Sequence, residues 1–268
     1  MIIIGEKING TRQEVAQAIR ARDAAFIARL AREQVDAGSR YLDVNAGTAP
    51  DREPEDLAWL VRTVQAECEV PLCLDSANPT ALRAALAVVD RTPMLNSVSG
   101  EAQRIAGVLP LALEHGTDLI LLALDDDGIP ATGEDRMQVV DRLVGLAVAG
   151  GLQEEKLFID PLVTAISTGT NNALLTCDTI RRIKVAYPKA HITCGLSNIS
   201  FGMPLRGLVN RTFLAMAVQA GLDSAIADPN DRELRETMLA AETLMGLDRY
   251  CLNFNKAFRA GRIGPRPD

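Results

Sequence analysis

The stretch Pro71–Asp75, PLCLD, shows the pattern on which the whole chain is built. A short apolar run ends in a carboxylate, and a segment with helical periodicity follows it. Seven further runs end on an acid or an amide in the same way: IIIGEKIN (2–9), YLDVN (41–45), PMLNS (93–97), DLILLALDDD (118–127), LFIDP (157–161), HITCGLSN (191–198) and SAIAD (224–228). Eight strand-then-helix units predict a closed parallel barrel, the (β/α)8 TIM barrel of the α/β class.

Length and composition agree with one such barrel. The chain has 268 residues, of which 47% are hydrophobic, enough to fill a large core. We predict a single domain over residues 1–268, with residues 255–268 as a loose tail, because its end, GRIGPRPD, is polar. No apolar run approaches the length of a membrane helix, and no basic region precedes the first strand.

Charge and residue usage exclude several classes of function. A net charge of −7 argues against a nucleic-acid surface and against binding to an anionic membrane, since both need a basic field. The five cysteines form no CxxC spacing, and an odd number of them predicts a reduced, cytoplasmic protein. Two histidines are too few for a histidine-rich metal site or a Ser-His-Asp triad, so we expect no metal bound by this chain.

The strand ends carry the chemistry. In a parallel barrel the carboxyl ends of all strands meet at one face, so these acids and amides should converge on one mouth. A carboxylate accepts from two adjacent N–H groups, as an aminopyrimidinone ring offers, and a carboxamide donates and accepts at once. The predicted ligand is therefore polar, flat and rich in N–H groups. No GxGxxG or GxxxxGK[ST] phosphate-binding motif is present.

Seven motifs in order carry a family resemblance: GEKING (5–10), LDVNAG (42–47), CLDSAN (73–78), MLNSVSG (94–100), FIDPL (158–162), GLSNISFGMPLRGLVNRTFLAMA (195–217) and GLDSAIADP (221–229). Together they resemble the methyltetrahydrofolate:corrinoid protein methyltransferases. These belong to the pterin-binding family, which also includes dihydropteroate synthase and the folate module of cobalamin-dependent methionine synthase. The resemblance runs from Ile2 to Asn253.

The resemblance implies an enzyme that moves a methyl group between tetrahydrofolate (as methyltetrahydrofolate) and the cobalt of a corrinoid, a cobalamin, carried by a partner protein. Asp75, Asn96 and Asp160 would then hold the pterin ring, and Asn198 would be both a pterin ligand and the catalytic residue beside the nitrogen that carries the methyl. Further candidates for the pocket are Glu6, Asn9, Asp43, Asn45, Ser197, Asp228 and Arg206, the last for the anionic glutamate tail. A homodimer is also implied.

Alternatives remain open at this point. An Asp after a strand is commonly a turn former or helix cap, which applies above all to Asp228 before the last helix. Asp125–Asp127 is interpreted as a solvated turn, with a cation site as the alternative.

The direction of methyl transfer is undetermined. The chain could also be a non-catalytic folate-binding docking subunit of a corrinoid demethylase system. Dihydropteroate synthase fits less well, because its Lys and Ser-x-Arg signature is missing.

Overall fold

The computed structural model describes residues 1–265 and confirms the predicted barrel. Eight parallel strands pair in the order β7-β6-β5-β4-β3-β2-β1-β8. The ring closes where the N–H of Ile226 donates to the carbonyl of Cys194 at 2.9 Å. The strands are β1 (Ile2–Asn9), β2 (Tyr41–Asn45), β3 (Leu72–Asp75), β4 (Met94–Ser99), β5 (Asp118–Leu122), β6 (Leu157–Asp160), β7 (His191–Ile192) and β8 (Ser224–Ala227).

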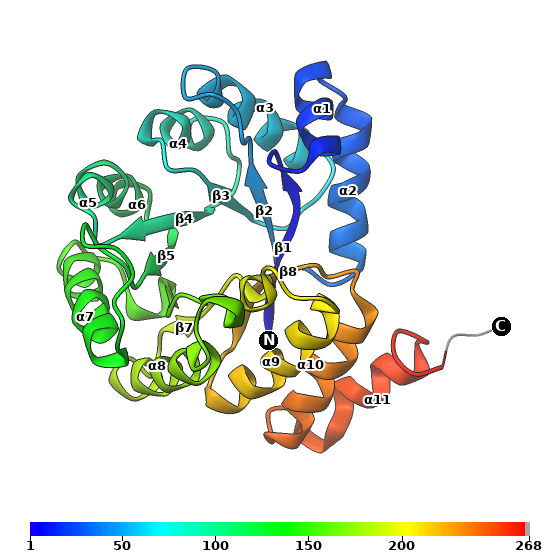
Figure 1. Ribbon diagram of the computed structural model, residues 1–268. Coiled ribbons are helices and arrows are strands. Elements are labelled where there is room, and N and C mark those ends of the chain that lie inside the picture. Colours follow the sequence, from blue (N-terminus) through cyan, green and yellow to red (C-terminus); the bar gives the residue numbers. More distant parts are fainter. Residues whose placement is uncertain (266–268) are drawn as a thin grey trace.

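Helices form an outer ring around these strands (Figure 1). They are α1 (Gln13–Ala21), α2 (Ala24–Asp36), α3 (Glu53–Gln65), α4 (Pro79–Leu86), α5 (Ala102–Gly107), α6 (Leu109–His115), α7 (Gly133–Ala149), α8 (Asn172–Ala186), α9 (Arg206–Ala220), α10 (Arg232–Leu244) and α11 (Leu252–Arg259). Short 3-10 turns are η1 (Glu154–Lys156), η2 (Ile166–Thr168), η3 (Leu196–Ser200) and η4 (Arg249–Cys251).

Local sequence explains where several helices begin. Asn78 caps α4 by accepting from the Thr80 N–H at 3.0 Å, and Pro79 occupies the first turn, where its missing N–H costs nothing. Asp23 caps α2 in the same way, through the Phe26 N–H. Arg22, in the left-handed conformation, ends α1 and separates it from α2.

The core has two parts. A large layer of buried aliphatic side chains lies between the sheet and the helices. A small apolar plug fills the inside of the barrel and consists of Ile4, Cys73, Met94, Ile120 and Phe158. Because side chains of a strand alternate, a residue two positions after a plug residue also points inward, one layer nearer the mouth. The plug is therefore the floor of the space that the strand ends enclose.

Three features differ from the sequence expectation. Where the strand-then-helix pattern predicts one helix after β4, the chain forms two, α5 and α6, which meet at Val108. β7 is only two residues long, and the segment expected to be its end is the 3-10 turn η3. Residues 255–259 belong to α11, which lies outside α10 in Figure 1.

The C-terminal segment is thus ordered further than the loose tail that we placed at 255–268. Ala257 and Ile263 are buried, and Arg232 donates to the carbonyls of Gly261 and Gly264. A few buried side chains and a bidentate arginine hold this segment against α10. Residues 266–268 lie outside the described residues.

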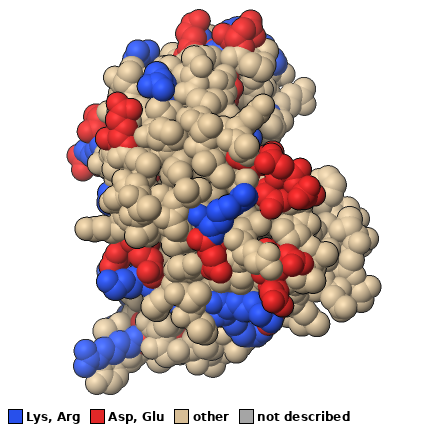
Figure 2. Space-filling view, turned by 90° about the vertical axis from the view of Figure 1, so that its left-hand side faces the viewer, with Lys and Arg blue, Asp and Glu red and all other residues tan. Residues whose placement is uncertain are grey.

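The surface agrees with the charge argument. On the face that Figure 2 shows, acidic and basic side chains are interspersed. None of the helices within residues 1–265 is long and apolar enough to cross a membrane.

Candidate functional site

Several predicted site residues stand directly above the apolar plug. Each lies two positions after an inward-facing plug residue or a residue packed against the plug, and so shares its face of the strand. The pairs are Ile4 with Glu6, Tyr41 with Asp43, Cys73 with Asp75, Met94 with Asn96 and Phe158 with Asp160. Alternation along five strands therefore turns five polar side chains into the barrel mouth.

Two carboxylate–carboxamide pairs connect β2, β3 and β4. The Asn45 amide donates to Asp75 Oδ2 at 2.8 Å, and the Asn96 amide donates to Asp43 Oδ1 at 3.3 Å. Asp75 and Asn96 are also register partners on adjacent strands. The four residues form one polar cluster of alternating acceptors and donors, which suits the edge of a ring with mixed donors and acceptors.

Burial changes the protonation of this cluster. Desolvation raises the pKa of Asp43 well above its ordinary value, and the nearby charge of Asp75 raises it further. Desolvation also raises the pKa of Asp75, although the Asn45 hydrogen bond opposes this. A ligand that donates hydrogen bonds to these carboxylates would stabilise their ionised forms and so lower both pKa values.

Asp160 ends β6 and is buried in the mouth. Desolvation raises the pKa of Asp160 to about 7. Hydrogen bonds from the N–H groups of Leu162 and Gly195 and the positive charge of Arg136 oppose this rise. The Leu162 N–H donates to Asp160 Oδ1 at 2.7 Å. Leu162 is left-handed, with φ of 63°, a conformation that a leucine rarely adopts.

Arg136 holds the loop after β6 in that conformation. It lies on the buried face of α7, and its Nη1 donates to the carbonyls of Pro161 and Leu162 at 2.7 and 2.8 Å. Its Nε donates to the Pro130 carbonyl. Arg136 was not among the residues that we predicted for the site. The signal was present, because Arg136 occupies an apolar helical stripe with Val139, Val140 and Leu143.

Asn198 lies in η3 and its side chain is exposed at the mouth. Its neighbour Ser197 is half-buried, and the Ser197 carbonyl accepts from Arg206 Nη2 at 2.8 Å. Arg206 Nε donates to the Ser200 hydroxyl at 3.0 Å. Arg206, which we predicted to bind an anionic tail, therefore uses two of its donors to fix the turn that carries Asn198.

The remaining candidates lie around β1 and β8. Lys7 forms an ion pair with Asp228, and Asp228 also accepts from the Asn230 N–H, which is the turn-forming role that we considered for it. Burial, then the charge of Asp228, raises the pKa of Glu6. Asn9 accepts from the backbone N–H and hydroxyl of Thr11, so its side chain stabilises the turn after β1.

The acidic turn Asp125–Asp127 is built as a turn. Asp125 accepts from the Asp127 N–H, and Asp126 accepts from the Ala102 N–H at the start of α5. In the part of the chain from Met1 to residue 265, no group of three or more His, Cys, Asp or Glu side chains is placed to hold a metal ion.

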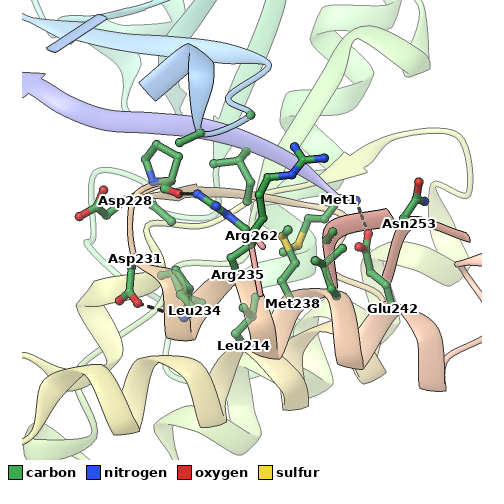
Figure 3. Close-up of a pocket in the computed structure, with 18 of the residues that line it drawn as sticks. Met1, Leu214, Asp228, Asp231, Leu234, Arg235, Met238, Glu242, Asn253 and Arg262 are labelled. Carbon is green, nitrogen blue, oxygen red and sulfur yellow. Dashed lines mark hydrogen bonds and ion pairs between the residues drawn. The ribbon is translucent and has the colours of Figure 1, made fainter. Parts of the chain in front are cut away.

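A separate cavity of about 320 Å³ lies outside the barrel wall, between β1, β8, α10 and α11 (Figure 3). The ion pair of the Met1 amine with Glu242 lies at one end of it, and Asp228 and Asp231 lie at the other. None of Asp75, Asn96, Asp160 or Asn198 lines this cavity, so it is distinct from the space above the plug; of the further pocket candidates, Asp228 lies in it.

Comparison with known sequences adds to this geometry. The profile of a family described as pterin binding enzyme matches residues 5–228. A methylcorrinoid:tetrahydrofolate methyltransferase of Eubacterium limosum is 42% identical over 267 residues, which cover 99% of this chain and 98% of that protein. Methionine synthase of Mycobacterium tuberculosis is 29% identical over 84% of this chain, which spans 20% of that longer protein.

Solved structures show the same fold at low identity. A dihydropteroate synthase of Coxiella burnetii in complex with pteroic acid superposes with a TM-score of 0.67 at 17% identity, over 92% of this chain and 93% of that one. The enzyme of Xanthomonas albilineans in complex with 7,8-dihydropteroate gives a TM-score of 0.68 at 15% identity, over 91% of this chain and 93% of the other. At these identities the likeness concerns the barrel alone.

Proposed function

This chain belongs to the family of pterin-binding enzymes, and we propose that it is a methyltransferase that moves a methyl group between a corrinoid protein and tetrahydrofolate. The observation that carries the proposal is the agreement of two findings. The first is 42% identity to a methylcorrinoid:tetrahydrofolate methyltransferase over nearly the full length of both chains. The second is the set of inward-facing carboxylates and carboxamides above the plug.

We assign the pterin ring to Asp75, Asn96 and Asp160. An ionised carboxylate accepts from the ring N–H and the exocyclic amine together, and each such charged hydrogen bond contributes roughly 1.5–3 kcal/mol. Asn96 adds a carboxamide at the register position beside Asp75. Asp43 and Asn45 complete this cluster through their hydrogen bonds to Asn96 and Asp75, and Glu6 faces the same space.

We propose transfer from the methylcorrinoid to tetrahydrofolate, the direction that the name of the 42% identical relative gives for that protein. A ring nitrogen of the folate attacks the methyl carbon, the methyl–cobalt bond breaks with its electrons left on cobalt, and the nitrogen then loses its proton. Positive charge develops on the nitrogen during this step. The Asn198 carboxamide, exposed at the mouth, would accept a hydrogen bond from that N–H and so stabilise the charge selectively.

Three further parts of the sequence prediction stay predictions: a homodimer, a cytoplasmic location and the absence of a metal bound by this chain. The corrinoid is a substrate carried by another protein, so the chain needs to supply placement and activation of the nitrogen rather than the cobalt chemistry itself.

The test is an anaerobic assay with purified protein, tetrahydrofolate and methylcobalamin, followed by the same assay with methylated corrinoid proteins. We expect methyltetrahydrofolate to form as the methylcobalamin spectrum converts to that of the demethylated corrinoid. Turnover would also eliminate the alternative that the chain is a non-catalytic docking subunit. Folded protein that transfers no methyl group from any of these donors would contradict the proposal.

A further inference from the structure

Exposed apolar side chains are distributed unevenly around the barrel mouth. Within residues 1–265, every large hydrophobic side chain that is strongly exposed lies at Ile129 or later, so the mouth loops after β1 to β4 contain none. Those at the mouth follow β5, β6 and β7 and are Ile129, Leu174, Phe201, Leu205 and Leu208. Within the described residues, the strongly exposed apolar side chains of the mouth are therefore confined to the part that follows β5, β6 and β7.

The densest part follows β7, where three such side chains occur within eight residues. Phe201 is 69% exposed, Leu205 78% and Leu208 49%. We call these three residues the mouth patch. The Leu208 N–H donates to the Leu205 carbonyl at 2.9 Å, so these two residues lie within the first turn of α9, with Leu205 as its N-cap.

Leu205 is unfavourable in two ways that folding alone does not explain. Its φ is 51°, in the left-handed region that favours glycine, and its side chain is almost fully in water. Glycine or asparagine would adopt this backbone conformation with less strain, and a polar side chain would be better hydrated. Burial of the side chain by another molecule would favour a leucine at this position.

The patch is joined to the proposed methyl-transfer position. The Phe201 N–H donates to the Asn198 carbonyl at 3.2 Å, which places Phe201 one 3-10 turn from Asn198. The Ser167 hydroxyl donates to the Phe201 carbonyl at 2.8 Å and ties this turn to the loop after β6. Arg206 bonds to Ser197 and Ser200 and fixes the same segment from the other side.

We propose that the mouth patch is the surface on which the protein that carries the corrinoid docks, so that the cobalt faces Asn198. This inference rests on the proposed function. Direct transfer requires the corrinoid to come within bonding distance of a methyl group or nitrogen held in the mouth, so its carrier must cover the rim there. An aromatic residue beside aliphatic ones is the composition of the buried centre of a protein–protein interface.

The test compares a free and a protein-bound corrinoid donor. Leu205→Lys and Phe201→Lys each place a charge in the mouth patch, outside the pterin cluster. At position 205, lysine and leucine are equally unfavourable in the left-handed backbone conformation, so the substitution tests the side chain alone. We expect the KM for the best methylated corrinoid protein to rise about tenfold or more, while methyl transfer from free methylcobalamin and the Kd for tetrahydrofolate stay unchanged.

The matched control is Leu244→Lys, because Leu244 is 86% exposed at the end of α10, on the opposite end of the barrel from the mouth. This variant should behave like the unmodified protein with both donors. A photo-crosslinking residue at Leu208 should capture the corrinoid protein.

Several results would overturn the inference. One is an unchanged KM for the corrinoid protein in both patch variants. Others are a crosslink from position 208 to a second copy of this chain, a weakened tetrahydrofolate Kd, or transfer from free methylcobalamin but from no corrinoid protein. If the unmodified protein transfers no methyl group from any donor, that result refutes the proposed function rather than the docking surface.

Discussion

Asn45 on β2 donates to Asp75 on β3 at 2.8 Å, across two neighbouring parallel strands. The bond uses one carboxylate oxygen, and within residues 1–265 the other oxygen accepts no hydrogen bond from the protein. The carboxamide thus orients the carboxylate and leaves one edge of it available to a ligand. It also opposes the rise in the pKa of Asp75 that burial causes.

Asp75→Ala should therefore weaken tetrahydrofolate binding by about 100-fold or more, since it removes a charged acceptor of two hydrogen bonds at roughly 1.5–3 kcal/mol each. Titration calorimetry measures the change. Asp127→Ala, at an exposed carboxylate of the acidic turn, is the control and should bind normally. A Kd for Asp75→Ala that matches the control would remove Asp75 from the pterin site.

The barrel and the inward direction of Asp75, Asn96 and Asp160 could be predicted from the sequence, because period-2 alternation and strand ends are local properties of the chain. The pairing of Asn45 with Asp75 could not, because it depends on the register between β2 and β3. The helix α11 was missed for a different reason. Phe254, Ala257 and Phe258 recur at helical spacing, but we gave more weight to the polar end of the chain, GRIGPRPD, and predicted a loose tail.

The pKa of Asp160, raised by burial to about 7, gives binding a pH dependence. If the ionised carboxylate accepts from the pterin, affinity should rise by about tenfold per pH unit as pH increases toward 7, and then level off. Asp160→Asn should abolish this slope. Parallel pH profiles of the two proteins would argue against Asp160 as the pterin acceptor.

The same shift affects folding without ligand. A carboxyl with a raised folded-state pKa contributes stability that is fully present below its unfolded pKa, near 3.8, and is lost as pH rises through about 7. The unliganded protein should therefore lose stability over this window relative to Asp160→Asn. Denaturant midpoints measured across that range give the comparison, and a constant difference between the two would contradict the shift.

Arg136 supports the site although it lies on a helix and not at the end of a strand. The guanidinium reaches from α7 to three backbone carbonyls and fixes the loop that points the Leu162 N–H at Asp160. Arg136→Met should cost about 2–4 kcal/mol of stability, because buried carbonyls lose their donors. It should also raise the pKa of Asp160 further, since the nearby positive charge is removed.

Denaturation and the pH profile of tetrahydrofolate binding together test this role for Arg136. Arg142→Met is a comparison on the same helix, since Arg142 donates to the Gly100 carbonyl rather than to the loop after β6. It should leave the binding profile unchanged. A role in stability alone would lower the denaturation midpoint of Arg136→Met without moving that profile.

Asn198 differs from the pterin ligands because it is exposed and lies on η3 rather than on a strand. We expect Asn198→Ala to lower kcat by about 100-fold, the usual effect of removing one group that stabilises a developing charge, and to change the tetrahydrofolate Kd little. Single-turnover transfer from methylcobalamin separates the two quantities. If Kd rises and the single-turnover rate stays the same, Asn198 holds the folate and takes no part in stabilising the nitrogen.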